Sequence, residues 1–115
     1  MLAIANKTRR NIANKDRKLF KKIHENILGK DYELSIVICT DKISPHNVLA
    51  YPLSKKEGEI FLNPQRAKTE AKNFKRDTHE HLLVLFAHAC LHLAGLKHGR
   101  TMERLEQKYA NPQGS

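Results

Sequence analysis

The sequence is poor in residues that cross-link, bend or break a chain, with two cysteines, four prolines, five glycines and no tryptophan in 115 residues. This composition excludes a collagen-like chain and a disulfide-rich scaffold. Cys39 and Cys90 lie inside apolar segments, so we expect two free core thiols and a cytoplasmic location. No apolar run approaches the ~20 residues of a membrane span. The first residues, MLAIANKTRRN, lack the apolar stretch of a signal peptide.

Acidic residues are also scarce, with 12 Asp and Glu against 21 Lys and Arg, which gives a net charge of +9. On so small a surface this excess attracts polyanions, and nucleic acid is the usual one. The alternative is a basic protein that its charge keeps soluble. Hydrophobic residues make up 40% and charged residues 29%, so the length predicts one globular domain over residues 1–115.

A first helix is predicted over Asn11–Leu28, where apolar residues recur at the spacing of one helical face before Gly29. Between Lys7 and Lys22 lie eight basic residues and a single acid, Asp16. The outer face of this helix is therefore strongly positive. It is either a solvated helix face or a surface that follows phosphates, and this segment alone does not decide between them.

The pattern then becomes extended and later returns to helices. Strands are predicted over Glu33–Thr40, Val48–Leu53 and Glu59–Asn63, the last two joined as a hairpin through Lys55–Gly58. Further helices are predicted over Gln65–Phe74, Thr78–Ala94 and Thr101–Tyr109. This order is typical of an α+β domain. Residues 111–115 are expected to form a frayed end.

Three histidines on and after the most apolar helix form the strongest chemical pattern. His88 and His92 are four residues apart, so their rings project from the same side of consecutive turns. Gly95 can end the helix in a left-handed conformation and let the chain bring His98 to the same point. Three imidazoles would bind zinc and leave a fourth position for water, as in catalytic sites. The alternative, three histidines satisfied within the core, needs many hydrogen-bond partners on an apolar helix.

The spacing matches the H-E-x-x-H-x-x-G-x-x-H pattern of metzincin peptidases, with one decisive difference. The position of the peptidases' general base is occupied by Ala89, which cannot accept a proton. Peptide hydrolysis by that mechanism is therefore disfavoured. An open metal site without a peptidase base, on a basic protein, indicates metal-assisted cleavage of phosphodiesters.

The segment HACLHLAGLKH resembles the H-G-x-L-H-L-x-G-x-D-H signature of the YbeY family, metal-dependent endoribonucleases of ribosomal RNA maturation. PHNVLAYP, residues 45–52, is similar to the family's P-T-[DN]-V-L-S-F-P strand. EGEIFLN, residues 57–63, is similar to its L-G-D-I-x-I-S strand. The histidine motif is highly specific, and the resemblance covers most of the chain.

The resemblance implies a small mixed four-stranded sheet packed with about four to five helices, in which the short MLAIANKT start is the first strand. It implies one zinc-like ion on His88, His92 and His98, with another divalent transition metal as the alternative. It also implies action on single-stranded RNA, with precursor ribosomal RNA as the substrate and ribosomal components as further partners. The sequence identifies no catalytic group beyond metal-bound water, no RNA-binding residue and no oligomeric state.

The chain departs from the family pattern at several places, and two of these departures bear most directly on the site. The family's Asp before the last histidine is Lys97, which places a positive charge close to the ion. The family's L-N-x-x-Y-R helix, whose Arg is thought to hold RNA, has no room between Thr40 and Pro45. Lys42, His46 and Arg66 are the candidates to replace that arginine.

Two further residues are weaker candidates. His81 lies seven residues before His88 and ~10 Å away along the helix, too far to bind the same ion. It could contact substrate, although a histidine without a special role is the more common case. Tyr51 could stack on a base, although packing is the commoner role of a strand tyrosine.

Three hypotheses remain, in order of preference. The first is a zinc-dependent endoribonuclease that cuts single-stranded RNA in ribosomal RNA processing. The second is a non-catalytic ribosome- or RNA-binding module with a structural metal, which Lys97 and the missing arginine helix favour. A small metallopeptidase ranks third because of Ala89.

Overall fold

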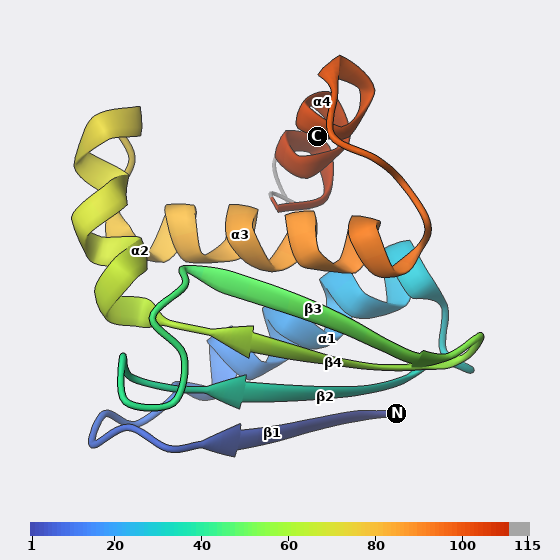
Figure 1. Ribbon diagram of the computed structural model, residues 1–115, viewed down its shortest axis with the longest axis horizontal. Helices are drawn as coiled ribbons and strands as arrows, with labels where there is room; N and C mark the ends of the chain where they lie inside the picture. Colours follow the sequence, from blue (N-terminus) through green and yellow to red (C-terminus); the bar gives the residue numbers. More distant parts are fainter. Residues whose placement is uncertain (111–115) are drawn as a thin grey trace.

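A mixed four-stranded sheet forms the base of the molecule in this computed structural model, which describes residues 1–110. The strands are β1 (Leu2–Asn6), β2 (Glu33–Ile38), β3 (Val48–Ser54) and β4 (Glu57–Leu62), arranged in the order β1-β2-β4-β3 (Figure 1). β1, β2 and β4 are parallel, and β3 runs antiparallel to β4 at the edge. The predicted α+β class and four-stranded mixed sheet are confirmed.

The helices are α1 (Asn14–Leu28), α2 (Pro64–Ala71), α3 (Thr78–Leu93) and α4 (Arg100–Ala110), with a short 3-10 turn, η1 (Lys72–Phe74), after α2. The helix predicted from Asn11 begins at Asn14, where the chain is still extended at Ala13. The helix predicted over 65–74 is divided between α2 and η1. The predicted end at residues 111–115 lies outside the described residues.

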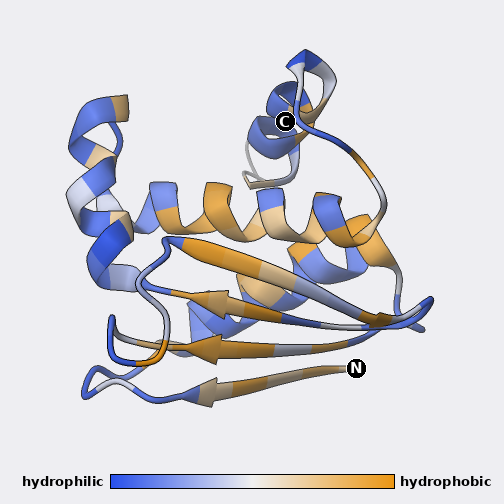
Figure 2. Ribbon diagram, viewed as in Figure 1, coloured by the Kyte–Doolittle hydropathy of each residue, from blue (hydrophilic) through white to orange (hydrophobic). Residues whose placement is uncertain are grey.

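One face of the sheet is buried, because apolar residues alternate along β2 and β4. Leu34, Ile36 and Ile38 on β2 face the core with Ile60 and Leu62 on β4. The helices α1 and α3 complete this core, in which Phe20 and Phe86 meet edge to face with ring centroids 4.8 Å apart. The apolar character of α3 is evident in Figure 2.

The predicted third strand begins two residues earlier than expected, at Glu57. Gly58 therefore belongs to the strand, opposite Pro52 of β3, and not to the turn. A side chain at this position has no room, since a Cβ would lie 2.5 Å from the Tyr32 hydroxyl and 3.0 Å from Leu93. The glycine that indicated a turn in the sequence serves close packing under the end of α3.

The ends of α3 set the position of its histidines. At the start, the Asp77 side chain accepts a hydrogen bond from the backbone N–H of Glu80 at 2.7 Å, a typical N-cap. At the other end, Gly95 adopts the left-handed region at φ 98°, as the sequence predicts. The helices α2 and α4 stand at opposite ends of α3 (Figure 1), so α3 forms the floor between them.

Candidate metal centre

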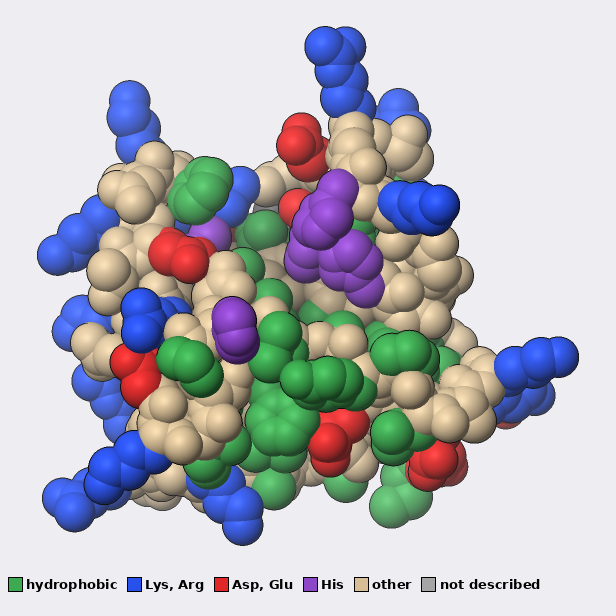
Figure 3. Space-filling view, in the orientation of Figure 1, with side chains coloured by type: hydrophobic (Ala, Val, Ile, Leu, Met, Phe, Trp, Pro, Cys, Tyr) green, Lys and Arg blue, Asp and Glu red, His purple; other side chains and the backbone are tan. Residues whose placement is uncertain are grey.

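His88, His92 and His98 lie together near the carboxyl end of α3. One ring nitrogen from each lies within 4.8 Å of the others, a grouping that could hold a metal ion. The ring centroids are 4.5 Å apart for His88 and His92, 4.9 Å for His88 and His98, and 4.6 Å for His92 and His98. Figure 3 shows histidine side chains gathered beside a hollow on this face of the molecule.

The backbone after α3 explains how His98 reaches the other two. The N–H of Gly95 donates to the carbonyl of His92 at 2.9 Å, and the N–H of Leu96 donates to the carbonyl of Leu91 at 3.0 Å. These two bonds close the helix and reverse the chain. His98 then returns over the last turn of α3, where His88 and His92 already share one side.

A carboxylate on α4 orients His88, and the sequence analysis did not identify it. The Nδ1 atom of His88 contacts Oε1 of Glu106, and the Glu106 side chain is only 13% exposed. A hydrogen on Nδ1 satisfies this carboxylate and leaves the lone pair on Nε2, the atom that faces His92 Nε2 at 3.0 Å. Carboxylates commonly fix metal-binding histidines in this way. The one signal in the sequence was a glutamate on the inner face of the helix that follows the histidine motif.

The protonation of His92 also suits a metal ligand. Burial lowers the pKa of His92 below 6.5, and positive charge on His88 and His98 would lower it further. His92 is therefore neutral at pH 7, with a nitrogen lone pair available. One ring nitrogen from each of the three imidazoles faces the other two, within 4.8 Å. Three nitrogen ligands in this arrangement fit one divalent transition ion.

The three histidines line one side of a cleft of about 1090 Å³. Its other walls come from β3 and the residue before it, from α2, from η1 and the loop after it, and from α4. Three carboxylates line it, those of Glu70, Glu103 and Glu106. Within residues 1–110, the one Lys or Arg side chain among the lining residues is Arg76. A substrate strand thus meets few positive charges inside the cleft, although the protein as a whole is basic.

His81 lies in the same cleft but outside the three-histidine group, as its distance along the helix predicts. It is 2% exposed and has partners on both ring nitrogens. Nε2 is 3.1 Å from Oε1 of Glu70, and Nδ1 is 3.2 Å from a terminal nitrogen of Arg76. These contacts, absent from the sequence analysis, join α2, the loop before α3 and α3 itself.

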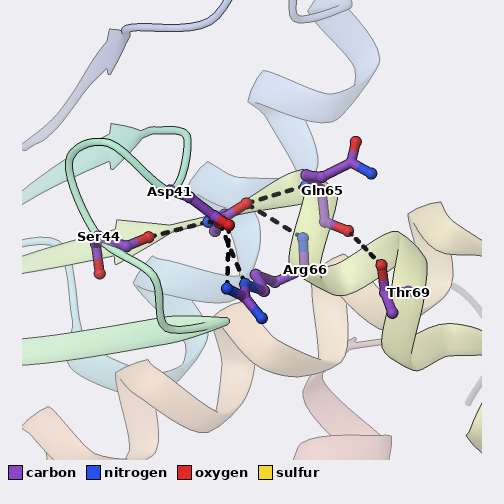
Figure 4. Close-up of polar contacts among 6 residues, drawn as sticks. Asp41, Ser44, Gln65, Arg66 and Thr69 are labelled. Carbon is purple, nitrogen blue, oxygen red and sulfur yellow. Dashed lines mark hydrogen bonds and ion pairs between the residues drawn. The ribbon is translucent and has the colours of Figure 1, made fainter.

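The three residues considered as substitutes for the family's arginine lie elsewhere. Arg66 is engaged with Asp41 through two contacts of 3.2 and 3.0 Å (Figure 4). Lys42 lines a separate cavity of about 690 Å³ beside the β1–α1 loop. His46 is exposed and does not belong to the lining of the cleft. Arg76, which does line the cleft, lies in the loop before α3, a segment without a recognisable sequence motif.

The remaining candidates lie outside the three-histidine group. Cys39 and Cys90 are free and buried, as expected, and burial raises the pKa of both thiols. Tyr51 is 48% exposed and packs edge to face on Phe61 at 5.8 Å between ring centroids. Among the residues that the structure describes, no helix has the length and apolar character to cross a membrane.

Fold and site together define a small α+β protein with three convergent histidines at the end of a buried helix, open to a cleft. The family model described as Endoribonuclease YbeY matches residues 3–111, and the chain belongs to this family. The resemblance seen in the sequence is thereby confirmed.

Curated relatives and a solved structure agree with this assignment. The chain is 32% identical over 80 residues to Endoribonuclease YbeY of Thermodesulfovibrio yellowstonii, and this match covers 58% of this chain and 50% of the relative. It is 39% identical over 75 residues to that of Gluconobacter oxydans, covering 59% and 45%. The chain thus spans about half the length of these two relatives. The match to the Neorickettsia sennetsu protein, 28% identical, covers 82% of this chain and 78% of the relative.

The solution structure of TM1509 from Thermotoga maritima has the same fold. It superposes with a TM-score of 0.69 at 24% identity, covering 96% of this chain and 87% of that chain. At this level of identity the comparison supports the fold alone.

Proposed function

We propose that this chain is a metal-dependent endoribonuclease that cuts single-stranded RNA, with precursor ribosomal RNA as its substrate. The observation that carries the proposal is the set of three imidazoles facing one point in an open cleft. Membership in a family whose curated relatives are named endoribonucleases supports the substrate class. The unit of function is one domain over residues 1–115.

His88, His92 and His98 would hold one ion, with zinc favoured because three neutral imidazoles suit it. A bound divalent ion would supply a Lewis acid for a phosphoryl oxygen and lower the pKa of water toward ~7. The role of Glu106 is to hold the His88 ring so that Nε2 faces His92. Ala89, which is 1% exposed, places no carboxylate beside His88, so the site lacks the peptidase base.

The charge distribution supports a nucleic-acid substrate. The +9 net charge attracts RNA to the surface as a whole, and the basic residues between Lys7 and Lys22 lie mostly exposed on α1 and the loop before it. Single-stranded RNA can place its unstacked bases in a protein cleft, whereas the bases of a duplex are paired and stacked. Ribosomal components are the proposed partners and the cytoplasm the proposed compartment, in keeping with two free thiols.

A non-catalytic RNA-binding module with a structural metal is the second candidate. It is favoured by Lys97, an exposed cation next to His98, and by the predominance of carboxylates in the cleft. The openness of the site favours the enzyme, because structural zinc sites are normally closed by four protein ligands.

Cleavage of a labelled single-stranded RNA tests the proposal, with chelator, zinc add-back and the His88→Ala variant. We expect cleavage that chelator removes, zinc restores and His88→Ala abolishes. The matched control is His79→Ala. His79 lies on the same helix, but its ring contacts Asp16 and does not line the cleft. Cleavage that persists in chelator, or that His88→Ala retains at the wild-type rate, would overturn the proposal. Tight RNA binding and one bound metal without cleavage would favour the second candidate.

A further inference from the structure

A second cluster of side chains lines the cleft, contributed by the residue before β3, α2, η1, the loop after η1 and the start of α3. It consists of Asn47, Glu70, Phe74, Arg76 and His81, all of which line the cleft together with the three histidines. An inference about this cluster rests on the proposed function, since it concerns how the cleft holds an anionic strand. A phosphodiester brought near Glu70, Glu103 and Glu106 is repelled unless a cation of the cleft meets it.

Arg76 is the cation in position to do so. One of its terminal nitrogens lies 3.2 Å from Nδ1 of His81. Its guanidinium carbon lies 5.1 Å from the centroid of the Phe74 ring, within the range of a cation–π contact. The residue is half-buried, so it is anchored at two points and still lines the cleft. A guanidinium carries several N–H donors, and one contact with His81 leaves the others free for a phosphate.

The hydrogen-bond pattern around His81 explains the orientation of Arg76. Oε1 of Glu70 accepts from the side-chain amide of Asn47 at 3.0 Å, and it lies 3.1 Å from Nε2 of His81. A carboxylate only accepts, so the hydrogen of the neutral imidazole is on Nε2. Nδ1 then has a lone pair, which accepts from the Arg76 guanidinium. Stacking on Phe74, at 5.2 Å and 20° between the rings, holds the imidazole in place.

We propose that Arg76 binds a phosphate of the RNA strand in the cleft and that His81, fixed by Glu70, is its positioning residue. The arginine holds the backbone on one wall of the cleft while the three histidines face it from another. Arg–phosphate pairs are strong because the planar guanidinium can donate two parallel hydrogen bonds. A cluster that only stabilises the fold would have no effect on RNA affinity in a folded variant.

RNA binding by metal-free protein in chelator tests this without depending on cleavage. Arg76→Ala should weaken binding of a single-stranded RNA about tenfold. It should also reduce the slope of log affinity against log salt by about 0.7, the value for one phosphate contact on a single strand. Lys30→Ala is the charge-matched control, since Lys30 is exposed in the loop between α1 and β2 and outside the cleft. Equal affinity and slope for the two variants would overturn the role of Arg76.

A double-mutant cycle tests the positioning role of His81. His81→Phe keeps the ring on Phe74 and removes both nitrogens, and it should weaken RNA binding several-fold. In the Arg76→Ala background the same change should have no further effect, because the residue it positions is already absent. Additive losses would overturn the positioning role.

Cleavage assays test the proposed nuclease, and binding assays test the role of Arg76, so the failure of one proposal can be told from the failure of the other. If wild-type protein cleaves RNA, Arg76→Lys should raise KM more than it lowers kcat, with the metal content unchanged. If wild-type protein does not cleave, the proposed nuclease fails while the binding measurements still decide the role of Arg76. A change in bound metal on Arg76→Ala would contradict the inference, because Arg76 does not belong to the three-histidine group.

Discussion

The two ends of α3 place histidines in different surroundings: at the start a single histidine has protein partners on both ring nitrogens, and at the end a group of histidines faces one another. His81, near the start of α3, has a carboxylate on one ring nitrogen and a guanidinium on the other. His88 and His92, near its end, face each other and His98 across 4.5–4.9 Å between ring centroids. The first group is complete within the protein. The second leaves ring nitrogens directed at one another, and a cation is the partner that satisfies them together.

The difference arises from the segments packed against α3 and not from the helix itself. At the start, α2 contributes Glu70 and the following loop contributes Arg76, so the imidazole has both an acceptor and a donor. At the end, the loop after Gly95 contributes a third imidazole, and α4 contributes Glu106 to one ring only. The neighbours in space therefore decide whether a histidine on an apolar helix has its hydrogen-bond partners within the protein or joins a group that could hold a metal ion.

The largest expected effect comes from removing one imidazole of the three-histidine group, and it concerns metal binding and cleavage. His92→Ala should lose metal binding and any metal-dependent cleavage together, because two remaining ligands are too few for a zinc site. Isothermal titration with zinc and an RNA cleavage assay measure the two effects. His79→Ala on the same helix should retain both, and one zinc bound at wild-type affinity by His92→Ala would contradict the assignment.

Loosening the second group without removing a ligand should have a smaller effect. Glu106→Gln keeps the size of the side chain but weakens its hold on Nδ1 of His88. We expect metal affinity to fall by about 10- to 100-fold, as for other carboxylates that orient histidine ligands. A competition titration against a chelator of known affinity measures this. Unchanged affinity would show that His88 is oriented by packing alone.

The free energy of unfolding without metal should also distinguish His81 from His92. His81→Leu should lower the free energy of unfolding by roughly 1–3 kcal/mol, because it leaves Glu70 and Arg76 without their partner. The lower end is expected, since Glu70 is 35% exposed and water replaces part of the contact. His92→Leu should be neutral or stabilising under the same conditions. Urea unfolding in chelator measures both, and equal losses would contradict the contrast.

Local signals in the sequence were sufficient for the helices, for the strands β2, β3 and β4 and for the grouping of the three histidines, whereas β1 was expected only from the family resemblance. The spacing of His88 and His92 and the left-handed glycine at position 95 are properties of one continuous segment. The buried strands β2 and β4 follow from their apolar residues in the same way. Gly58 misled the prediction because a turn and a close approach to Tyr32 call for the same residue.

The partners of the histidines could not be predicted, because they come from other elements. Glu106 is 18 residues from His88, and Glu70 is 11 residues from His81. Each is one carboxylate among 12 acidic residues, and its position depends on how α2 and α4 pack against α3. Arg76 was missed for the same reason, while Arg66, which the sequence made equally plausible, is engaged with Asp41.

The smallest expected effect is a pH dependence of stability in the metal-free protein. Burial lowers the pKa of His92 and of His24, although a hydrogen bond to the Tyr32 carbonyl opposes this for His24. In both cases the unfolded chain takes up a proton near pH 6.5 while the folded chain does not. The free energy of unfolding therefore falls as pH decreases below about 7 and stops falling below the folded pKa.

Single substitutions separate the two contributions. In chelator, His92→Leu should flatten part of the decrease between pH 7 and pH 5, and His24→Leu should flatten another part. For His24 the physical reason is geometric as well, since Nδ1 is buried with no hydrogen-bond partner among residues 1–110 and has nowhere to place a second proton. Urea midpoints at three pH values measure the slopes. With saturating zinc the wild-type slope should steepen, because protons then compete with the ion for His92; an unchanged slope would exclude His92 as a ligand.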